Sequence, residues 1–226
     1  MIETVFFDLG DTLIYMDPLP EEVFASLCRE EGIAVEPEAV RRAYGKADLF
    51  YFANMLAYRG RMERLWLEYD GIVLQELGIS DPGRRLARAI SEGFREGQFW
   101  HLFPETEEVL VELRREGYKL GIISNADEDV ERILSWLGLL EYVDTITYSQ
   151  EVGVEKPDPR IFQIALQRTG SNPREALHVG DRYDADIVGA RAAGIAPVLI
   201  DREEDHRDPD CPRIRSLEEL WGILRA

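Results

Sequence analysis

The sequence predicts an α/β protein whose core is an open parallel sheet covered by helices on both faces, with an all-helical domain inserted into it. Short apolar segments alternate with helical patterns through the second half of the chain, which is typical of consecutive βα units. Such units build a parallel sheet between two layers of helices. One stretch near the start, from about residue 19 to residue 99, contains only helical patterns and interrupts this alternation.

The first expected strand precedes the helical stretch and the other strands follow it. The expected strands are Thr4–Leu9, Lys119–Ser124, Val143–Tyr148, Ala176–Gly180 and Pro197–Ile200. Helices of the core are expected at Thr106–Glu116, Glu128–Leu137, Pro159–Thr169, Ala185–Ala193 and Leu217–Leu224. The acidic stretch Asp201–Asp210, before the last of these helices, is expected to be a solvated loop. Helices of the insert are expected at Glu21–Glu31, Pro37–Tyr58, Met62–Leu77 and Pro82–Glu96. The predicted domains are therefore a core of residues 1–16 and 100–226 and an insert of residues 17–99.

Composition narrows the class of protein. With 226 residues the chain can bury a large core. Its formal net charge of -18 argues against a nucleic-acid partner, because a phosphate backbone would be repelled. The two cysteines, Cys28 and Cys211, form no short-spaced metal pair, which favours a reduced, cytoplasmic protein. The chain begins without the pattern of a signal peptide, and no segment approaches membrane-spanning length, so we expect no membrane partner.

Polar groups gather at the carboxyl ends of three of the predicted strands, where ligands bind in sheets of this kind. They are Asp8 at the end of the first strand, Ser124 and Asn125 at the end of the second, and Gly180, Asp181 and Asp186 at and after the end of the fourth; Lys156 lies in the loop EVGVEKPDP. A carboxylate can attack phosphorus and form an acyl phosphate, and two further carboxylates can hold Mg²⁺. A hydroxyl and a lysine can neutralise the phosphoryl oxygens as charge develops. The set predicts a phosphoryl-transfer site.

At these motifs the sequence resembles the haloacid dehalogenase superfamily along nearly its whole length. The motifs are DLGDT at Asp8, Ser124 in GIISNAD, Lys156 in VEKPDP, and Asp181 with Asp186 in HVGDRYDADIVGARAAG. The resemblance implies a Rossmann-like core with a helical cap of the C1 branch, and a phosphoric monoester hydrolase that works through an aspartyl-phosphate. It implies Asp8 as nucleophile, Mg²⁺ held by Asp8, the Gly10 carbonyl, Asp181 and Asp186, and phosphate bound by Ser124, Asn125 and Lys156. Asp186 would hold waters of the metal or orient Lys156.

The first motif departs from the family pattern in one position. Family phosphatases carry an acid two residues after the nucleophile, which protonates the leaving oxygen; here that position is Gly10, and the second acid is Asp11. A shift of one residue changes the direction of the side chain, so Asp11 is first expected to be a turn residue and only second an acid or base.

The sequence therefore predicts a Mg²⁺-dependent phosphatase of a small phosphorylated metabolite, acting as a monomer or homodimer. Three alternatives stay open: a dehalogenase, a phosphonate hydrolase, and a non-catalytic phosphate-binding protein. The pair Gly180–Asp181 favours a metal-dependent enzyme over a dehalogenase. A phosphonate hydrolase would need a lysine in the cap, and the only one there, Lys46, is expected on a solvated helix face. His178, inside an apolar run, is expected to be a packed strand residue.

Overall fold

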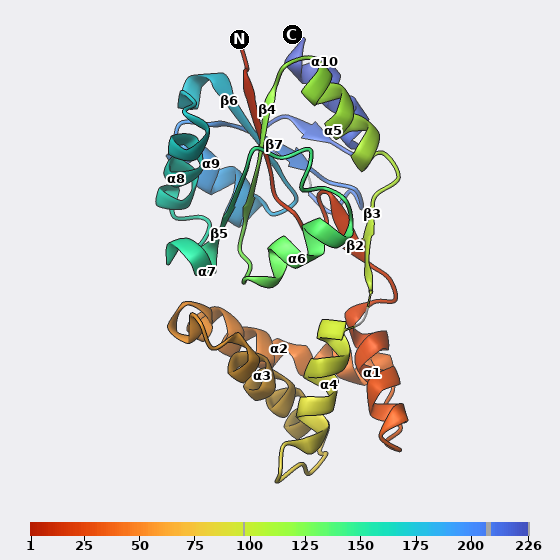
Figure 1. Cartoon of the computed structure of the whole chain (residues 1–226). Coiled ribbons are helices and arrows are strands. Elements are labelled where there is room, and N and C mark those ends of the chain that lie inside the picture. The colour runs from red at the N-terminus through yellow and green to blue at the C-terminus, as the bar shows by residue number, and fades with distance from the viewer. Residues whose placement is uncertain (97, 207–208, 226) are drawn as a thin grey trace. The chain divides into compact units, whose positions relative to one another are not determined.

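The chain folds into two compact units. The computed structural model describes residues 1–96, 98–206 and 209–225. One unit consists of Met1–Tyr15 and Trp100–Ala226, and the other of Met16–Phe99. We call them the core unit and the helical insert, and Figure 1 shows the elements of each.

The core unit is built on a parallel sheet, which confirms the predicted fold class. Its order is β5-β4-β1-β6-β7-β8, and every neighbouring pair is parallel. The strands are β1 Thr4–Phe7, β4 Lys119–Ser124, β5 Thr145–Tyr148, β6 Ala176–Gly180, β7 Ala196–Ile200 and β8 Arg213–Ile214. Strand β1 lies in the middle, with Phe7 beside Ile122 of β4 and Val179 of β6. The carboxyl ends of these three strands therefore meet at one edge of the sheet.

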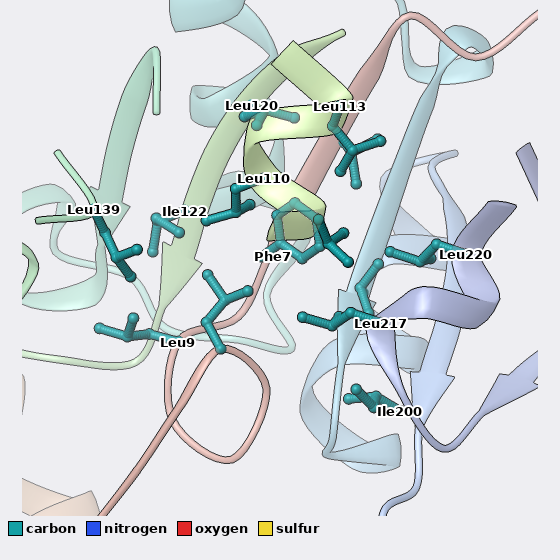
Figure 2. Close-up of a cluster of buried hydrophobic side chains, with 14 of the residues drawn as sticks. Phe7, Leu9, Leu110, Leu113, Leu120, Ile122, Leu139, Ile200, Leu217 and Leu220 are labelled. Carbon is teal, nitrogen blue, oxygen red and sulfur yellow. The ribbon is translucent and has the colours of Figure 1, made fainter. Parts of the chain in front are cut away.

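Helices cover both faces of this sheet (Figure 1). The helices on one face are α5 Thr106–Arg115, α6 Asp129–Trp136 and α10 Leu220–Leu224, and those on the other are α8 Pro159–Thr169 and α9 Val188–Ala192. Side chains of β1 alternate between the two layers, because successive strand residues point to opposite faces. Phe7 packs with Leu110 and Leu113 of α5 (Figure 2), whereas Phe6 packs with Phe162 of α8. Burying one such side chain stabilises the fold by about 1.5–3 kcal/mol.

The helical insert has four helices with a hydrophobic core of their own. They are α1 Pro20–Glu30, α2 Pro37–Asn54, α3 Met62–Glu76 and α4 Arg85–Glu96, and a 3-10 turn, Met55–Tyr58, follows α2. Two of them begin with proline, which suits a first turn whose N–H groups lack helical partners. Helix α4 begins three residues later than predicted, because the Asp81 carboxylate accepts the N–H groups of Arg85 (3.0 Å) and Ala87 (2.9 Å). Phe24, Val40 and Ile90 are among the fully buried side chains at the centre of the insert.

Three short strands were not predicted. Strands β2 (Ile14–Met16) and β3 (Trp100–Leu102) pair with each other, and β8 joins the edge of the main sheet. Each has three residues or fewer, too short to show an alternating pattern. Of the predicted loop 201–210, residues 207–208 lie outside the described residues, and Asp201 is buried rather than solvated. Within the described part of the chain, no helix has the length and apolar character needed to cross a bilayer.

Candidate active site

The site begins where β1 ends. Asp8 follows the last residue of the strand, is 8% exposed, and donates its backbone N–H to the carbonyl of Val179 at 2.8 Å, so the sheet register continues into it. A tight loop comes next: the N–H of Asp11 donates to the carbonyl of Ile14 at 2.7 Å, and Asp11 adopts a left-handed backbone with φ of 53°. Gly10 forms an isolated bridge with Ile14. The loop fixes the direction in which the chain leaves Asp8.

Lys156 is the cation of the site. Its Nζ lies 2.6 Å from Asp8 Oδ1 and 2.6 Å from Asp186 Oδ1, and the residue is only 5% exposed. The backbone of Lys156 is held by the Asn125 side chain, whose Oδ1 accepts the Lys156 N–H at 2.7 Å and whose Nδ2 donates to the Lys156 carbonyl at 3.0 Å. Asn125 follows β4, so this two-point contact connects the lysine loop to the sheet.

Asp186 lies over the end of β6 and is completely buried. It belongs to a short π-helical segment, Tyr183–Ile187, and its Oδ2 accepts the N–H of Arg182 at 3.1 Å. A Cβ at Gly180 would lie 2.2 Å from Asp186 Cγ. Glycine is therefore required at position 180 for the Asp186 carboxyl to occupy its place. Single π-helical turns of this kind are often found at functional sites.

Three carboxylates converge at this edge of the sheet. Asp8, Asp181 and Asp186 each offer one oxygen, and these oxygens lie within 4.8 Å of one another. Burial, assisted by Asp8 and Asp186, raises the pKa of Asp181 to about 8, with Lys156 opposing. A group of carboxylates with too few cations near it raises the pKa of its members, because the negative charges repel one another. A divalent cation such as Mg²⁺, which prefers oxygen ligands, would supply the missing positive charge and lower the pKa of Asp181. The donor set fits Mg²⁺.

Charges at the site are divided unequally among the carboxyls. Burial acts to raise the pKa of Asp186, but the Lys156 ammonium and the hydrogen bond from His178 outweigh it, and this pKa lies well below its ordinary value. Burial acts to lower the pKa of Lys156, but Asp186 and Asp8 raise it to about 12. For Asp8, burial raises the pKa against the opposing effect of Lys156. At neutral pH the structure thus holds a charged lysine against an ionised Asp186.

The structure brings most of the predicted site residues to one place, although their chemical roles stay predictions. Asp8, Asp181, Asp186 and Lys156 lie in direct contact or within a few ångströms of one another. Ser124 is the last residue of β4 and Asn125 follows it, and both polar atoms of the Asn125 amide already contact the Lys156 backbone. The Asp11 pKa is raised by partial desolvation and then by Asp8, with Arg202 opposing. Asp11 therefore lies within electrostatic reach of Asp8, in a turn.

One neighbouring residue has no counterpart among the sequence predictions. The Arg202 guanidinium donates to the Thr12 carbonyl at 2.8 Å and to Glu105 Oε1 at 2.7 Å, and it stacks 3.5 Å from the centre of the Phe103 ring. Through the Thr12 carbonyl, Arg202 holds the loop that follows Asp8 in place. Because Arg202 lies within the acidic stretch Asp201–Asp210, its local sequence indicates a solvated loop, and only the fold reveals the partner 190 residues away.

Comparison with known proteins agrees with this geometry. The profile of one family, described as haloacid dehalogenase-like hydrolase, matches residues 2–194. The chain belongs to this family. The helical insert, which lies between β1 and β4 in the sequence, corresponds to the family's C1 cap.

Relatives of the chain in the haloacid dehalogenase-like family include several phosphatases. A glyceraldehyde 3-phosphate phosphatase of Methanothermobacter thermautotrophicus is 38% identical over 235 residues, which cover 99% of this chain and 100% of the relative. A phosphoserine phosphatase of Thermus thermophilus is 31% identical over 248 residues, covering 97% of this chain and 98% of the relative. Among solved structures, a 2-haloacid dehalogenase of Pseudomonas syringae matches with a TM-score of 0.71 and 28% identity, covering 100% of this chain and 99% of that one. Relatives of both reaction types therefore share this scaffold.

Proposed function

We propose that the protein is a Mg²⁺-dependent phosphatase that hydrolyses a small phosphorylated metabolite through an aspartyl-phosphate on Asp8. The observation that carries this proposal is the arrangement of Asp8, Lys156 and the two further carboxylates at the end of β1. A carboxylate, a buried ammonium 2.6 Å from it and a cation-binding set of oxygens are the parts that phosphoryl transfer needs. The relatives named for two phosphate esters support the same reaction class.

The reaction would proceed in two displacements at phosphorus. In the first, an Asp8 oxygen forms a bond to phosphorus while the bond from phosphorus to the ester oxygen breaks, and the ester oxygen leaves as an anion that takes a proton from water. In the second, water attacks phosphorus and gives up a proton, the bond to Asp8 breaks, and inorganic phosphate and the free carboxylate are released. Lys156, charged at neutral pH, would neutralise phosphoryl oxygens in both steps, together with the Ser124 hydroxyl. Mg²⁺, when held by Asp8, the Gly10 carbonyl and Asp181, would supply further positive charge to these oxygens.

Asp186 would orient Lys156 in this mechanism. Its two oxygens already accept hydrogen bonds from Lys156, His178 and the Arg182 N–H. These contacts favour the second of the two roles that the family resemblance implies for Asp186, which is to orient Lys156, over direct or water-mediated metal binding.

Protonation of the leaving oxygen separates this site from an ordinary family phosphatase. Gly10 has no carboxyl to give, and Asp11 lies one residue further on, in its left-handed turn. The aryloxide of an aryl phosphate is stable enough to leave without a proton, whereas the alkoxide of an alkyl phosphate needs one. The site should therefore favour substrates with acidic leaving groups.

The lysine that a phosphonate hydrolase would need in the cap is engaged elsewhere. Lys46, the only lysine of residues 17–99, is 69% exposed and pairs with Glu76 within the insert at 2.8 Å. A lysine this exposed on a helix fits the solvated role expected from the sequence, and this favours phosphatase over phosphonate chemistry. The dehalogenase relative keeps that reaction as the second candidate, which would proceed without metal.

The decisive experiment is hydrolysis of an aryl phosphate by the wild type and by Asp8→Asn, each with Mg²⁺ and with a chelator. We expect turnover only in the wild type with Mg²⁺. A dehalogenase would instead release halide from a 2-haloacid with the chelator present. A binding protein would show no turnover of either compound, while phosphate raised its melting temperature.

A further inference from the structure

A buried histidine lies directly behind the candidate active site. The Nε2 atom of His178 is 2.8 Å from Asp186 Oδ1, and both side chains are almost completely excluded from solvent. The sequence suggests only a packed strand residue. The structure shows the packing too, since the ring meets Phe162 edge to face with 5.1 Å between the centroids. The contact with Asp186 is the additional finding.

The register of β6 explains how the two side chains meet. His178 and Gly180 are two residues apart, so they face the same side of the sheet, the side covered by α8 and α9. Because Gly180 has no side chain, Asp186 can lie across the end of the strand and reach His178. His178 pairs in register with Phe6, two residues before Asp8, so the histidine lies at a fixed place below the nucleophile.

The hydrogen bonds around the contact show which nitrogen of His178 carries the proton. Both oxygens of Asp186 already accept hydrogen bonds, Oδ1 from the Lys156 ammonium and Oδ2 from the Arg182 N–H, so His178 Nε2 carries the hydrogen of the third contact and donates it. His178 Nδ1 is buried without a hydrogen-bond partner in the described chain, which suits an unprotonated nitrogen better than an N–H group. Asp186 Oδ1 then accepts from two donors, the His178 imidazole and the Lys156 ammonium.

We propose that His178 is a positioning residue whose Nε2–H anchors Asp186, so that Asp186 holds the Lys156 ammonium beside Asp8. The inference rests on the proposed function, in which Lys156 and Asp8 act on a phosphoryl group. His178 touches neither phosphate nor metal and acts through Asp186. Interactions behind a functional side chain commonly change activity by about 10–100-fold when they are removed.

Two substitutions separate the hydrogen bond from the packing. His178→Gln keeps an N–H donor at about the distance of Nε2 from the backbone, whereas His178→Leu fills space without a donor. Phe162→Leu is the matched control, because it disturbs the same buried cluster and leaves the contact with Asp186 in place. Each variant is assayed with an aryl phosphate and Mg²⁺ and its melting temperature is recorded.

We expect His178→Leu to lower kcat at least about tenfold, His178→Gln to restore it to within a few-fold of the wild type, and Phe162→Leu to lower the melting temperature with little effect on kcat. Equal losses in the Gln and Leu variants, or losses that follow melting temperature across all three, would leave only a packing role and overturn the proposal.

Two measurements decide the matter without any turnover. The chain has three histidines, so a ¹⁵N-histidine NMR spectrum can be assigned by substitution, and we expect His178 to carry a proton on Nε2 that is hydrogen-bonded to Asp186. A crystal structure of His178→Leu should show Lys156 Nζ displaced from Asp8. If Lys156 stays between Asp8 and Asp186 in that structure, the positioning role is wrong. A wild type without phosphatase turnover would overturn the proposed function alone, whereas an active His178→Leu enzyme would overturn only this inference.

Discussion

Two glycines near Asp8 differ in what surrounds them. A Cβ at Gly180 would lie 2.2 Å from Asp186 Cγ, whereas a Cβ at Gly10 would meet no heavy atom of the described chain within 4 Å. Gly10 also lacks the positive φ that would require glycine. Gly180 is thus needed by the geometry of the site, while neither space nor backbone angle demands glycine at position 10.

Gly180→Ala should displace Asp186 and lower kcat for an aryl phosphate at least about tenfold, since overpacking shifts neighbouring groups. Kinetics and a melting curve of the variant measure both effects. The control is Gly45→Ala in helix α2, where a Cβ meets nothing within 4 Å and alanine should add up to about 1 kcal/mol of stability. Full activity in Gly180→Ala would mean that the place of Asp186 does not matter for catalysis.

Gly10→Asp should be tolerated by the fold and should speed hydrolysis of alkyl phosphates, which need a proton on the leaving oxygen. A positioned general acid is worth about 10²–10⁴-fold, so we expect at least about a tenfold gain, with aryl phosphates little changed. The comparison is with Gly10→Asn, which has the same size and no acid. A gain of equal size in the Asn variant would show that acidity is not the cause.

At the scale of elements, helix α3 carries an unusual group into the core of the insert. Asp70 is 4% exposed, and burial raises the pKa of its carboxyl well above the ordinary value. The groups whose own pKa values it raises are Cys28 on α1 and Tyr44 on α2, together with its neighbour Tyr69. The folded insert therefore prefers Asp70 protonated.

The sign of the resulting pH dependence follows from linkage. In the unfolded chain Asp70 ionises near pH 4, at its pKa of about 3.9, but in the folded insert it stays protonated to higher pH. Stability from this group is therefore complete below about pH 4 and is lost as pH rises towards the folded pKa. Asp70→Asn should remove the loss, so its advantage over the wild type in urea unfolding should grow between about pH 4 and pH 7. A constant difference across this range would contradict the assignment.

The elements that the sequence predicts well are those with long patterns. Helices α5, α8 and α10 and strands β4 and β6 end within a few residues of their predicted limits, because apolar periodicity and flanking glycine or proline define them locally. Strands β2, β3 and β8 are too short to leave a pattern. An ordinary helix is predicted over Ala185–Ala193, but its first three residues belong to the π-helical segment Tyr183–Ile187, and α9 begins only at Val188.

The same limit applies to the site. Asp8, Lys156, Asp181 and Asp186 are recognisable because each is a charged residue at a strand end or in a motif of fixed order. The contacts of Asn125 with Lys156, of His178 with Asp186 and of Arg202 with Thr12 depend on which strands are neighbours. A sequence gives no local sign of such pairs, since the chemistry of each residue fits a surface or packing role equally well.

At the scale of the molecule, the net charge of -18 sets a general repulsion within the folded chain. Most ion pairs of the structure are exposed and contribute little, so they do not offset this repulsion. Raising NaCl from about 10 mM to about 150 mM shortens the Debye length from about 30 Å to about 8 Å, and we expect the melting temperature to rise. Sucrose at equal osmolality serves as the uncharged control. A melting temperature that fell with salt would show that local ion pairs outweigh the repulsion.

The strand pair β2–β3 also has a consequence for how such a chain can change over time. The two segments that connect the core unit to the insert lie side by side as paired strands, and Asp17 N–H donates to the Phe99 carbonyl at 2.9 Å. The two ends of the insert are therefore adjacent, and the insert is a closed loop with respect to the core unit. Because each doubling of loop length costs only about 0.6 kcal/mol, an insert of quite different size could be exchanged at this junction without rerouting the sheet. The insert could then diverge in size and sequence while Asp8 and its neighbours stayed as they are.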